Sequence, residues 1–263
     1  YDMMVSGFDS KAVSVLRLWK AKSVQNFDMK LFSQGDYNAV MQEDNEADLI
    51  SKVLYPADNH VEGKSLRLKQ QYFLVSASLQ NILKDHKRRY GSIRLLPQLA
   101  AIHLNDTHPA LAVPELMRLL IDENGMSWEE AWAVTTSVCA YTNHTVLAEA
   151  LETWPEDLIA RKLPRIYSIL KEINRRFCED LWKRFPGDWD KISRMAIISY
   201  NVVKMANLSV YGSHCVNGVS KLHSDIIKKS IFRDFYDYTP EKFTNVTNGI
   251  AHRRWLNQSN PEL

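Results

Sequence analysis

The sequence predicts an α/β protein in which a parallel sheet is flanked by many helices. Two apolar runs, residues 99–104 and 137–142, are too short for helices and enclose two helical segments. A strand–helices–strand order of this kind is typical of a βαβ crossover, which makes the two strands parallel. A third apolar run, residues 214–219, follows the same alternation, and we expect a third strand there.

The part of the chain before this crossover is predicted to be mostly helical. Residues 12–19 alternate well enough for a strand, and residues 36–54 form one or two short helices. These helices end at Tyr55, because the following Pro56 disfavours a helical residue before it. Residues 64–90 form a long helix, and Gly91 supplies its stop signal.

The helices of the crossover and of the C-terminal half follow from periodicity and caps. One helix is expected from Pro109 to about Asp122. The next begins at Ser127, which forms a capping box with Glu130. Three further helical segments are predicted: 156–193, 200–211 and 221–231.

Composition and net charge limit the kinds of partner that we expect for this protein. The chain has 263 residues, of which 45% are hydrophobic and 24% charged, as is ordinary for a globular protein that buries a sizeable core. Its net charge of +2 is spread over both signs. Neither a nucleic acid nor an anionic membrane is therefore expected as a partner.

Cysteine usage indicates the redox compartment, and the chain ends bear on whether a longer protein is expected. The three cysteines, Cys139, Cys178 and Cys215, are too few and too scattered for a disulfide framework or a zinc cluster. We expect buried, reduced thiols in a cytoplasmic protein, since no signal peptide or long apolar segment is present. The ends, Tyr1 and Leu263, are typical of a segment taken from a longer protein.

Polar residues follow each predicted strand of the crossover. The first strand ends in residues 105–108 (NDTH), the second in residues 142–145 (TNHT), and the third near Asn217. Ligands of open parallel sheets bind beyond the carboxyl ends of the strands. These side chains offer both donors and acceptors, which suits a sugar. The alternative is that Asn and Asp only cap the following helices.

Other kinds of site are less well supported. His103, Asp106 and His108 could be metal ligands, but on a strand the two histidines face opposite sides. A Ser-His-Asp triad is possible by composition, although no GxSxG nucleophile elbow is present. No GxGxxG or Walker-type loop occurs either, so a conventional nucleotide cradle is absent from the sequence.

Long motifs in family order resemble those of the α-glucan (glycogen, starch and maltodextrin) phosphorylases. Residues 105–118 (NDTHPALAVPELMR) and 139–155 (CAYTNHTVLAEALETWP) are similar to two of them. Residues 54–70 (LYPADNHVEGKSLRLKQ) and 247–256 (TNGIAHRRWL) are similar to two more. These motifs span nearly the whole chain, so the resemblance is specific.

The resemblance implies a fold and a reaction. Family enzymes have two Rossmann-like lobes of the glycosyltransferase-B type, and residues 1–263 would be an incomplete N-terminal, glucan-side domain. The enzymes cleave terminal α-1,4 linkages of a glucan with inorganic phosphate and release glucose 1-phosphate. The expected cofactor is pyridoxal phosphate, whose lysine lies in the C-terminal lobe, outside this chain. The chain alone is expected to be inactive.

By the same resemblance, some residues of this chain contact the sugar. His144 matches the histidine whose ring hydrogen-bonds the glucosyl 6-hydroxyl, and Asn248 matches an asparagine that binds the same unit. Asp58 and Asn59 match a mobile gate loop beside the site. Two strand-end residues match the pocket wall: Asp106 and His108.

The resemblance also implies partners and leaves alternatives. The region from Ser33 to Pro56 matches a subunit-interface helix, so a homodimer is expected. Lys84 and Asp85 replace an arginine pair that reads a nucleotide activator, and we therefore expect turnover without AMP. Two other functions remain as alternatives: a non-catalytic carbohydrate-binding fragment, or a lobe of a nucleotide-sugar glycosyltransferase.

Overall fold

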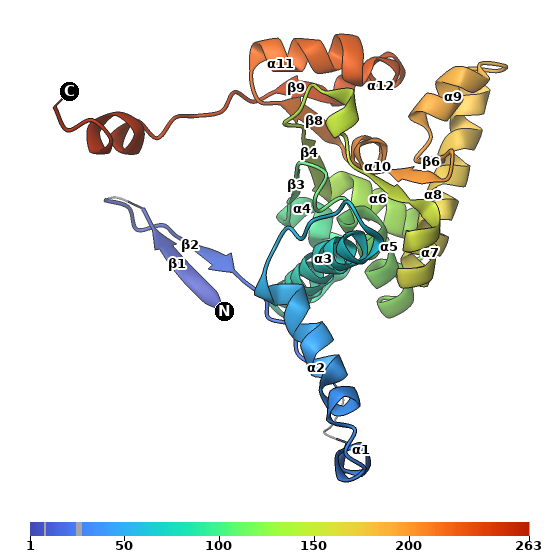
Figure 1. Cartoon of the computed structure of the whole chain (residues 1–263). Coiled ribbons are helices and arrows are strands. Elements are labelled where there is room, and N and C mark those ends of the chain that lie inside the picture. Colours follow the sequence, from blue (N-terminus) through green and yellow to red (C-terminus); the bar gives the residue numbers. More distant parts are fainter. Residues whose placement is uncertain (8, 25–27, 263) are drawn as a thin grey trace. The chain divides into compact units, whose positions relative to one another are not determined.

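The protein was studied as a computed structural model that describes residues 1–262 apart from residue 8 and residues 25–27. The described chain forms two compact units, residues 1–85 and residues 86–263 (Figure 1). In the part of the chain that the structure describes, no helix combines the length and the apolar character needed to cross a bilayer.

The first unit opens with a β-hairpin. Strands β1 (Asp2–Ser6) and β2 (Val13–Arg17) pair antiparallel, and the Arg17 guanidinium holds the Asp2 carboxylate at 2.6 Å. β2 confirms the strand predicted at 12–19, whereas β1 was not predicted, because its run DMMVS shows no alternation.

Three helices follow in this part of the chain. Helix α1 (Met29–Ser33) is short, and α2 (Tyr37–Lys52) is capped by Asp36, whose Oδ1 accepts from the Ala39 N–H. Helix α3 (Val61–Tyr90) runs through 30 residues. It ends where Gly91 adopts a positive φ of 75°, which glycine tolerates and which the sequence predicted as the stop.

The second unit is built on a four-stranded parallel sheet. Its strands are β3 (Ile102–Asn105), β4 (Cys139–Thr142), β8 (Cys215–Gly218) and β9 (Phe243–Asn245), in that spatial order. The parallel crossover and the third strand are therefore confirmed. β9 was not predicted, because three residues carry too little pattern to identify a strand.

Helices connect and cover these strands. Before β3 come a 3₁₀ turn (Ile93–Leu95) and α4 (Leu96–Leu99); between β3 and β4 come α5 (Ala112–Arg118), a π-helical turn (Leu119–Glu123) and α6 (Trp128–Val138). The capping box of Ser127 and Glu130 is formed in both directions. Residues 137–138 close α6, so the predicted run 137–142 is a strand only from Cys139.

Between β4 and β8 the chain departs from the predicted pattern. Residues 156–193 are not one helical stretch but three helices, α7 (Glu156–Lys162), α8 (Pro164–Arg184) and α9 (Trp189–Met195). Pro164 starts α8, and Gly187 turns before α9 with a φ of 84°.

A small antiparallel sheet was also missed by the sequence patterns. It joins β5 (Thr153–Pro155), β7 (Val202–Lys204) and β6 (Ile198–Ser199) in the order β5-β7-β6. A 3₁₀ turn (Ala148–Ala150) precedes β5. The predicted helix 200–211 is therefore helical only in α10 (Met205–Tyr211).

The C-terminal part of the unit supplies the last covering helices. α11 (Lys221–Ile226), a π-helical turn (Ile227–Ile231) and α12 (Arg233–Tyr238) follow β8, and a 3₁₀ turn (Pro240–Lys242) leads into β9. α11 contacts β8 and β9, and α10 contacts β4 (Figure 1). A final π-helical segment (Arg253–Gln258) has no buried residue.

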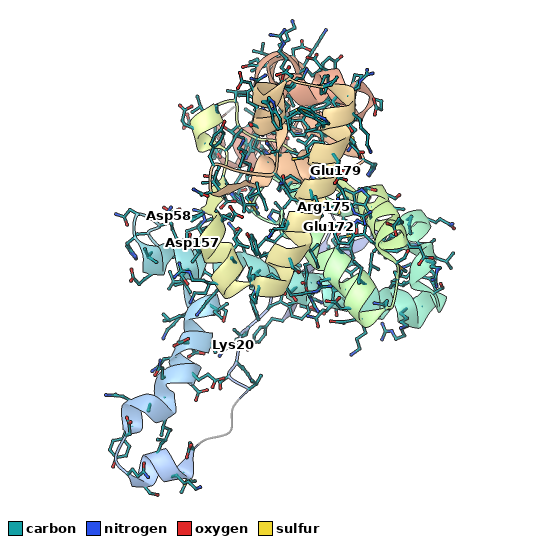
Figure 2. All side chains as sticks on the ribbon, turned by 90° about the vertical axis from the view of Figure 1, so that its right-hand side faces the viewer. Lys20, Asp58, Asp157, Glu172, Arg175 and Glu179 are labelled. Atoms are coloured by element: carbon teal, nitrogen blue, oxygen red, sulfur yellow. The ribbon has the colours of Figure 1, made fainter. Side chains whose placement is uncertain are left out.

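The sheet sits in an apolar core that fixes where its strands end. Leu104 and Val216 are fully buried within strands, and Tyr141 packs edge-on against Phe232 at 6.3 Å between ring centroids. α8 places Ile169, Ile173 and Phe177 on its buried face. On its outer face Arg175 bridges Glu172 and Glu179 (Figure 2), so its polar residues face water as an amphipathic helix requires.

Candidate functional site

The carboxyl edge of the parallel sheet is where the sequence predicts a polar site. One row of paired residues crosses the sheet near the carboxyl ends of its four strands: Asn105, Thr142, Asn217 and Thr244. Main-chain hydrogen bonds continue beyond this row. They run from Asp106 N to Thr142 O (2.9 Å), from Asn143 N to Asn217 O (3.0 Å) and from Val246 N to Gly218 O (3.1 Å). The first residues after β3, β4 and β9 are therefore hydrogen-bonded to the end of a neighbouring strand.

The first strand ends in a strained turn. Asp106 adopts a positive φ of 64°, and its Oδ1 accepts from the Thr107 N–H at 2.5 Å. Helix α5 starts only after Leu111, which makes no side-chain cap. The alternative that these strand-end residues simply cap the next helix is therefore wrong for Asp106. His108 is exposed in the turn between them.

The second strand end carries His144. Its side chain is exposed, and its Nε2 lies 2.6 Å from Asn105 Oδ1. A carbonyl oxygen only accepts, so Nε2 carries the proton of the neutral ring, and Nδ1 is left with a lone pair. The preceding Asn143 is fully buried and donates from Nδ2 to the Tyr141 hydroxyl at 3.1 Å. Burial raises the pKa of that Tyr141 hydroxyl, so it stays protonated.

A chain of side-chain hydrogen bonds crosses the sheet beside His144. The Thr142 hydroxyl donates to Asn217 Oδ1 at 2.7 Å, and Asn217 Nδ2 donates to the Gly218 carbonyl at 3.1 Å. Because the one hydroxyl proton is used, Thr142 accepts from His103, whose Nε2 lies 2.7 Å away. His103 is thereby engaged in the sheet.

The third and fourth strand ends close on α11. Ser220 caps this helix, and Ser224 on its first turns donates to Asn245 Oδ1 at 2.7 Å. A Cβ at Gly218 would lie 2.6 Å from Ser224 Oγ and 2.9 Å from its main chain, so only glycine fits there. Asn248, just after β9, is anchored by its N–H to the Val219 carbonyl at 2.9 Å.

The structure thus brings three of the predicted residues to one sheet edge: Asp106, His144 and Asn248. Asp58 and Asn59 belong to the first unit, where Asp58 pairs with Arg67 at 3.0 Å. Their predicted place in a gate loop stays a prediction. His223, which also contacts this edge, was missed because it is separated from Asn143 by 80 positions.

Among the residues that the structure describes, no three His, Cys, Asp or Glu side chains gather as metal ligands would. The described cysteines are free thiols; Cys139 is buried and Cys178 and Cys215 are half-buried, so the expectation of buried thiols holds for Cys139 alone. Burial raises the pKa of Cys139 to about 12, which makes it a poor nucleophile.

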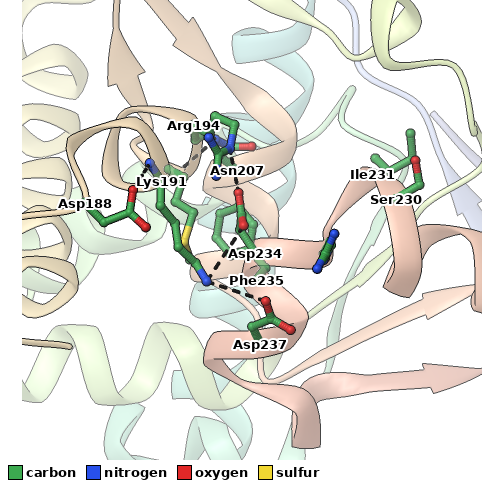
Figure 3. A pocket seen from close by; sticks show the side chains of 11 residues that line it. Asp188, Lys191, Arg194, Asn207, Ser230, Ile231, Asp234, Phe235 and Asp237 are labelled. Carbon is green, nitrogen blue, oxygen red and sulfur yellow. Dashed lines mark hydrogen bonds and ion pairs between the residues drawn. The ribbon is translucent and has the colours of Figure 1, made fainter. Parts of the chain in front are cut away.

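A separate cavity of about 560 Å³ is lined mainly by residues of α9 and α12, with Asn207 of α10 and two residues of the π-helical turn before α12 (Figure 3). Arg194 binds Asp234 at 2.8 Å, and Lys191 lies 3.5 Å from Asp237 and 3.8 Å from Asp234. These charges satisfy one another and join the two helices. None of the predicted site residues lines this cavity.

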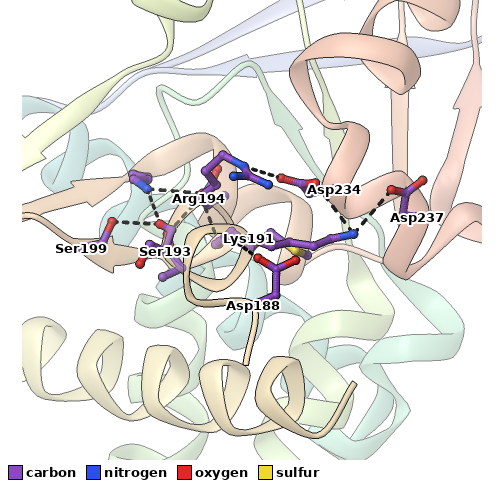
Figure 4. A network of polar contacts seen from close by, with 11 residues as sticks. Asp188, Lys191, Ser193, Arg194, Ser199, Asp234 and Asp237 are labelled. Carbon is purple, nitrogen blue, oxygen red and sulfur yellow. Dashed lines mark hydrogen bonds and ion pairs between the residues drawn. The ribbon is translucent and has the colours of Figure 1, made fainter. Parts of the chain in front are cut away.

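The end of α9 beside this cavity is held by further polar contacts (Figure 4). Lys204 Nζ donates to the carbonyls of Ser193 (2.8 Å) and Arg194 (3.3 Å). The buried Asn207 Nδ2 contacts the carbonyls of Arg194, Met195 and Ala196 at 2.8–3.0 Å. These side chains satisfy the open carbonyls of a helix end, which is a structural role.

Comparison with known proteins agrees with this arrangement. The model of the family described as carbohydrate phosphorylase matches residues 1–263, the whole chain. The chain belongs to the carbohydrate phosphorylase family. The sheet edge with His144 therefore lies in a chain of this family, and the predicted resemblance is confirmed.

Curated relatives carry the same family name. The chain is 50% identical to a glycogen phosphorylase of Bacillus subtilis over 263 residues, and 50% identical to the muscle form of glycogen phosphorylase from sheep (Ovis aries) over 274 positions. The human muscle form is 49% identical. Each match covers the whole chain and 32% of the relative, so the chain spans about a third of the length of these relatives.

Proposed function

We propose that this chain is the later part of the glucan-side, N-terminal domain of an α-glucan phosphorylase. That enzyme would cleave terminal α-1,4-glucosidic bonds of glycogen or maltodextrin with inorganic phosphate and release glucose 1-phosphate. The observation that carries the proposal is the polar carboxyl edge of the sheet in a chain that matches the phosphorylase family over its whole length.

The residues of the edge have defined parts in this proposal. The Nδ1 lone pair of His144, left by its contact with Asn105, accepts the 6-hydroxyl of the glucosyl unit. Asn248 contacts the same unit. Asp106 and His108 form the pocket wall, and Asp58 and Asn59 belong to the gate loop. Charge that develops on the sugar during cleavage is sensitive to fixed hydrogen-bonding groups of this kind.

Pyridoxal phosphate would supply the acid–base chemistry through its phosphate when bound. The residues described here do not fit the role of holding it. Lys204 and Lys242, whose ammonium groups are drawn into the fold, both donate to main-chain carbonyls at helix ends. We assign no residue of this chain to the cofactor, whose lysine would lie outside it.

A homodimer in the cytoplasm completes the proposal. The region from Ser33 to Pro56 contains α2, which has no buried residue. Tyr37, Met41 and Leu49 are exposed on it, and apolar side chains that gather on an exposed helix are typical of an interface. Light scattering of the full-length protein should give the dimer mass, and Leu49→Glu with Met41→Glu should shift it toward the monomer. A monomeric wild-type protein would contradict the interface.

The activity is tested with the full-length protein and with the 263-residue chain side by side. Each is incubated with maltoheptaose, phosphate and pyridoxal phosphate, and glucose 1-phosphate is measured. We expect product from the full-length protein and none from the chain alone. Glucan binding without any product would favour the carbohydrate-binding alternative, and glucosyl transfer from a nucleotide sugar would favour the glycosyltransferase.

A further inference from the structure

His223 is a buried histidine that none of the roles above uses. It lies in the first turn of α11, with only 8% of its surface exposed. Its ring reaches the loop that follows β4: Nε2 lies 3.1 Å from Asn143 Oδ1 and 3.4 Å from the Thr145 carbonyl. Asn143 and Thr145 are the two residues on either side of His144.

The contact of this ring with Val219 shows which of its nitrogens carries the proton. The Val219 N–H points at Nδ1 of His223 over 3.1 Å. A main-chain N–H only donates, so Nδ1 accepts and the proton of the neutral ring is on Nε2. Nε2–H therefore donates the hydrogen bond that Asn143 Oδ1 accepts. The ring links the β8–α11 turn to the loop after β4, with Nδ1 as the acceptor and Nε2–H as the donor.

The loop depends on this donor because Asn143 has no access to water. Its side chain is fully buried, its Nδ2 is used by the Tyr141 hydroxyl, and its N–H is used by the Asn217 carbonyl. Removing the donor from Oδ1 would leave a buried acceptor unpaired, which favours a rearranged loop. His144 itself is exposed, so its direction is set by the loop main chain and by Asn105.

We propose that His223 is a positioning residue for His144: its Nε2–H, bonded to Asn143 and facing Thr145, fixes the loop that aims the His144 ring at the sugar. The proposal rests on the proposed function, since the sugar contact of His144 belongs to it. His223 would not touch the sugar. A misplacement of about 1 Å transmitted to a group at the reacting sugar lowers turnover by on the order of 10²-fold.

Two substitutions at His223 separate this role from general stabilisation. The amide nitrogen of Gln reaches the place of Nε2, whereas that of Asn reaches only the place of Nδ1. In the full-length protein we expect His223→Gln to keep most of kcat, and His223→Asn to lose on the order of 10²-fold with little change in KM for the glucan. An Asn variant as active as wild type, or more active than the Gln variant, would overturn the proposal.

His214 offers a matched control at the opposite end of the same strands. It precedes β8, and its Nδ1 contacts the Cys139 carbonyl, at the start of β4, over 2.7 Å. His214→Gln removes this contact and should leave kcat unchanged. A loss equal to that of His223→Asn would mean that any His contact between these strands has the same effect, and the proposal would fall.

A double-mutant cycle and a structure complete the test. If His223 acts through His144, His223→Asn should add little to the loss already caused by His144→Ala; the same factor in both backgrounds would overturn the proposal. Crystal structures of wild type and His223→Asn should show residues 143–145 displaced in the variant, and an unmoved loop would overturn it too. This readout needs no activity, so a wild-type protein without phosphorolysis would refute the proposed function alone.

Discussion

Replacing His144 by Ala should separate a catalytic contribution from a structural one. The side chain is exposed, and its ring forms a 2.6 Å hydrogen bond with Asn105. One such hydrogen bond contributes about 1 kcal/mol to stability. For a domain of this size that corresponds to a fall in Tm of roughly 2–4 °C.

The expected loss of turnover is larger than this. If the ring accepts the 6-hydroxyl as the sugar approaches the transition state, its removal should lower kcat by on the order of 10²-fold, or about 2.7 kcal/mol. The alternative in which His144 only caps a following helix is wrong in this structure. The next helical turn starts at Ala148, its N-cap Leu147 makes no side-chain capping hydrogen bond, and the Leu147 N–H donates to Thr145 Oγ1.

The assay combines the melting temperature with two substrates in the full-length protein. Wild type and His144→Ala are compared on a normal glucan and on one that ends in a 6-deoxyglucosyl unit. The two proteins should differ on the normal glucan and become similar on the deoxy substrate, because no hydroxyl is left for the ring to hold. A rate deficit that persists unchanged on the deoxy substrate would refute the hydroxyl contact.

Three further changes test the fold around the site. Arg118→Ala should destabilise the chain by about 3–5 kcal/mol in urea unfolding, because Glu115 is fully buried and holds that guanidinium at 2.8 Å. The pair of Arg161 with Asp157 is exposed, so Arg161→Ala should cost less than about 1 kcal/mol. Equal losses in the two variants would contradict the burial argument. Burial of Cys139, with its pKa near 12, predicts that a thiol reagent at pH 8 modifies this cysteine only after unfolding, so Cys139→Ser should leave the native thiol titration unchanged. Burial lowers the pKa of Lys242 to about 8, below its unfolded value, so the unfolded state binds more protons than the folded state above pH 8. Between pH 8 and pH 10 the free energy of unfolding of wild type should therefore rise by on the order of 2 kcal/mol relative to that of Lys242→Met. Parallel curves of stability against pH would contradict this.

Much of the sheet was predictable because its strands are short apolar runs set between clear helices. The runs 137–142 and 214–219 contain β4 and β8, and the run 99–104 covers β3 except for its last residue, Asn105. Their shared direction followed from the crossover, and the polar edge followed from that direction. His144 and Asp106 could thus be placed at one edge before any coordinates were known.

What the sequence did not reveal depends on contacts between distant segments. β9 is three residues long, and β5, β6 and β7 are two or three residues each, so none shows a period of two. The breaks between α7, α8 and α9 are different, because Pro164 and Gly187 mark them in the sequence and the prediction of one helical stretch overlooked these local signals. The role of His223 depends on burial against Asn143, and no local pattern indicates which partner a histidine in a helix will meet.

The hydrogen bond between Thr142 and Asn217 has a consequence for the order of folding. The two residues are 75 positions apart, and most of the intervening chain forms local helices and the small antiparallel sheet. Closing a loop of that length opposes pairing by about 2 kcal/mol more than closing a 10-residue loop, so β8 should join β4 after the helices between them have formed. Until β8 arrives, Asn143 lacks the Asn217 carbonyl and the α11 turn that carries His223. The orientation of His144 is therefore acquired late, and in pulse-labelled hydrogen exchange during refolding the Asn143 amide should gain protection after the amides of α6 and α8.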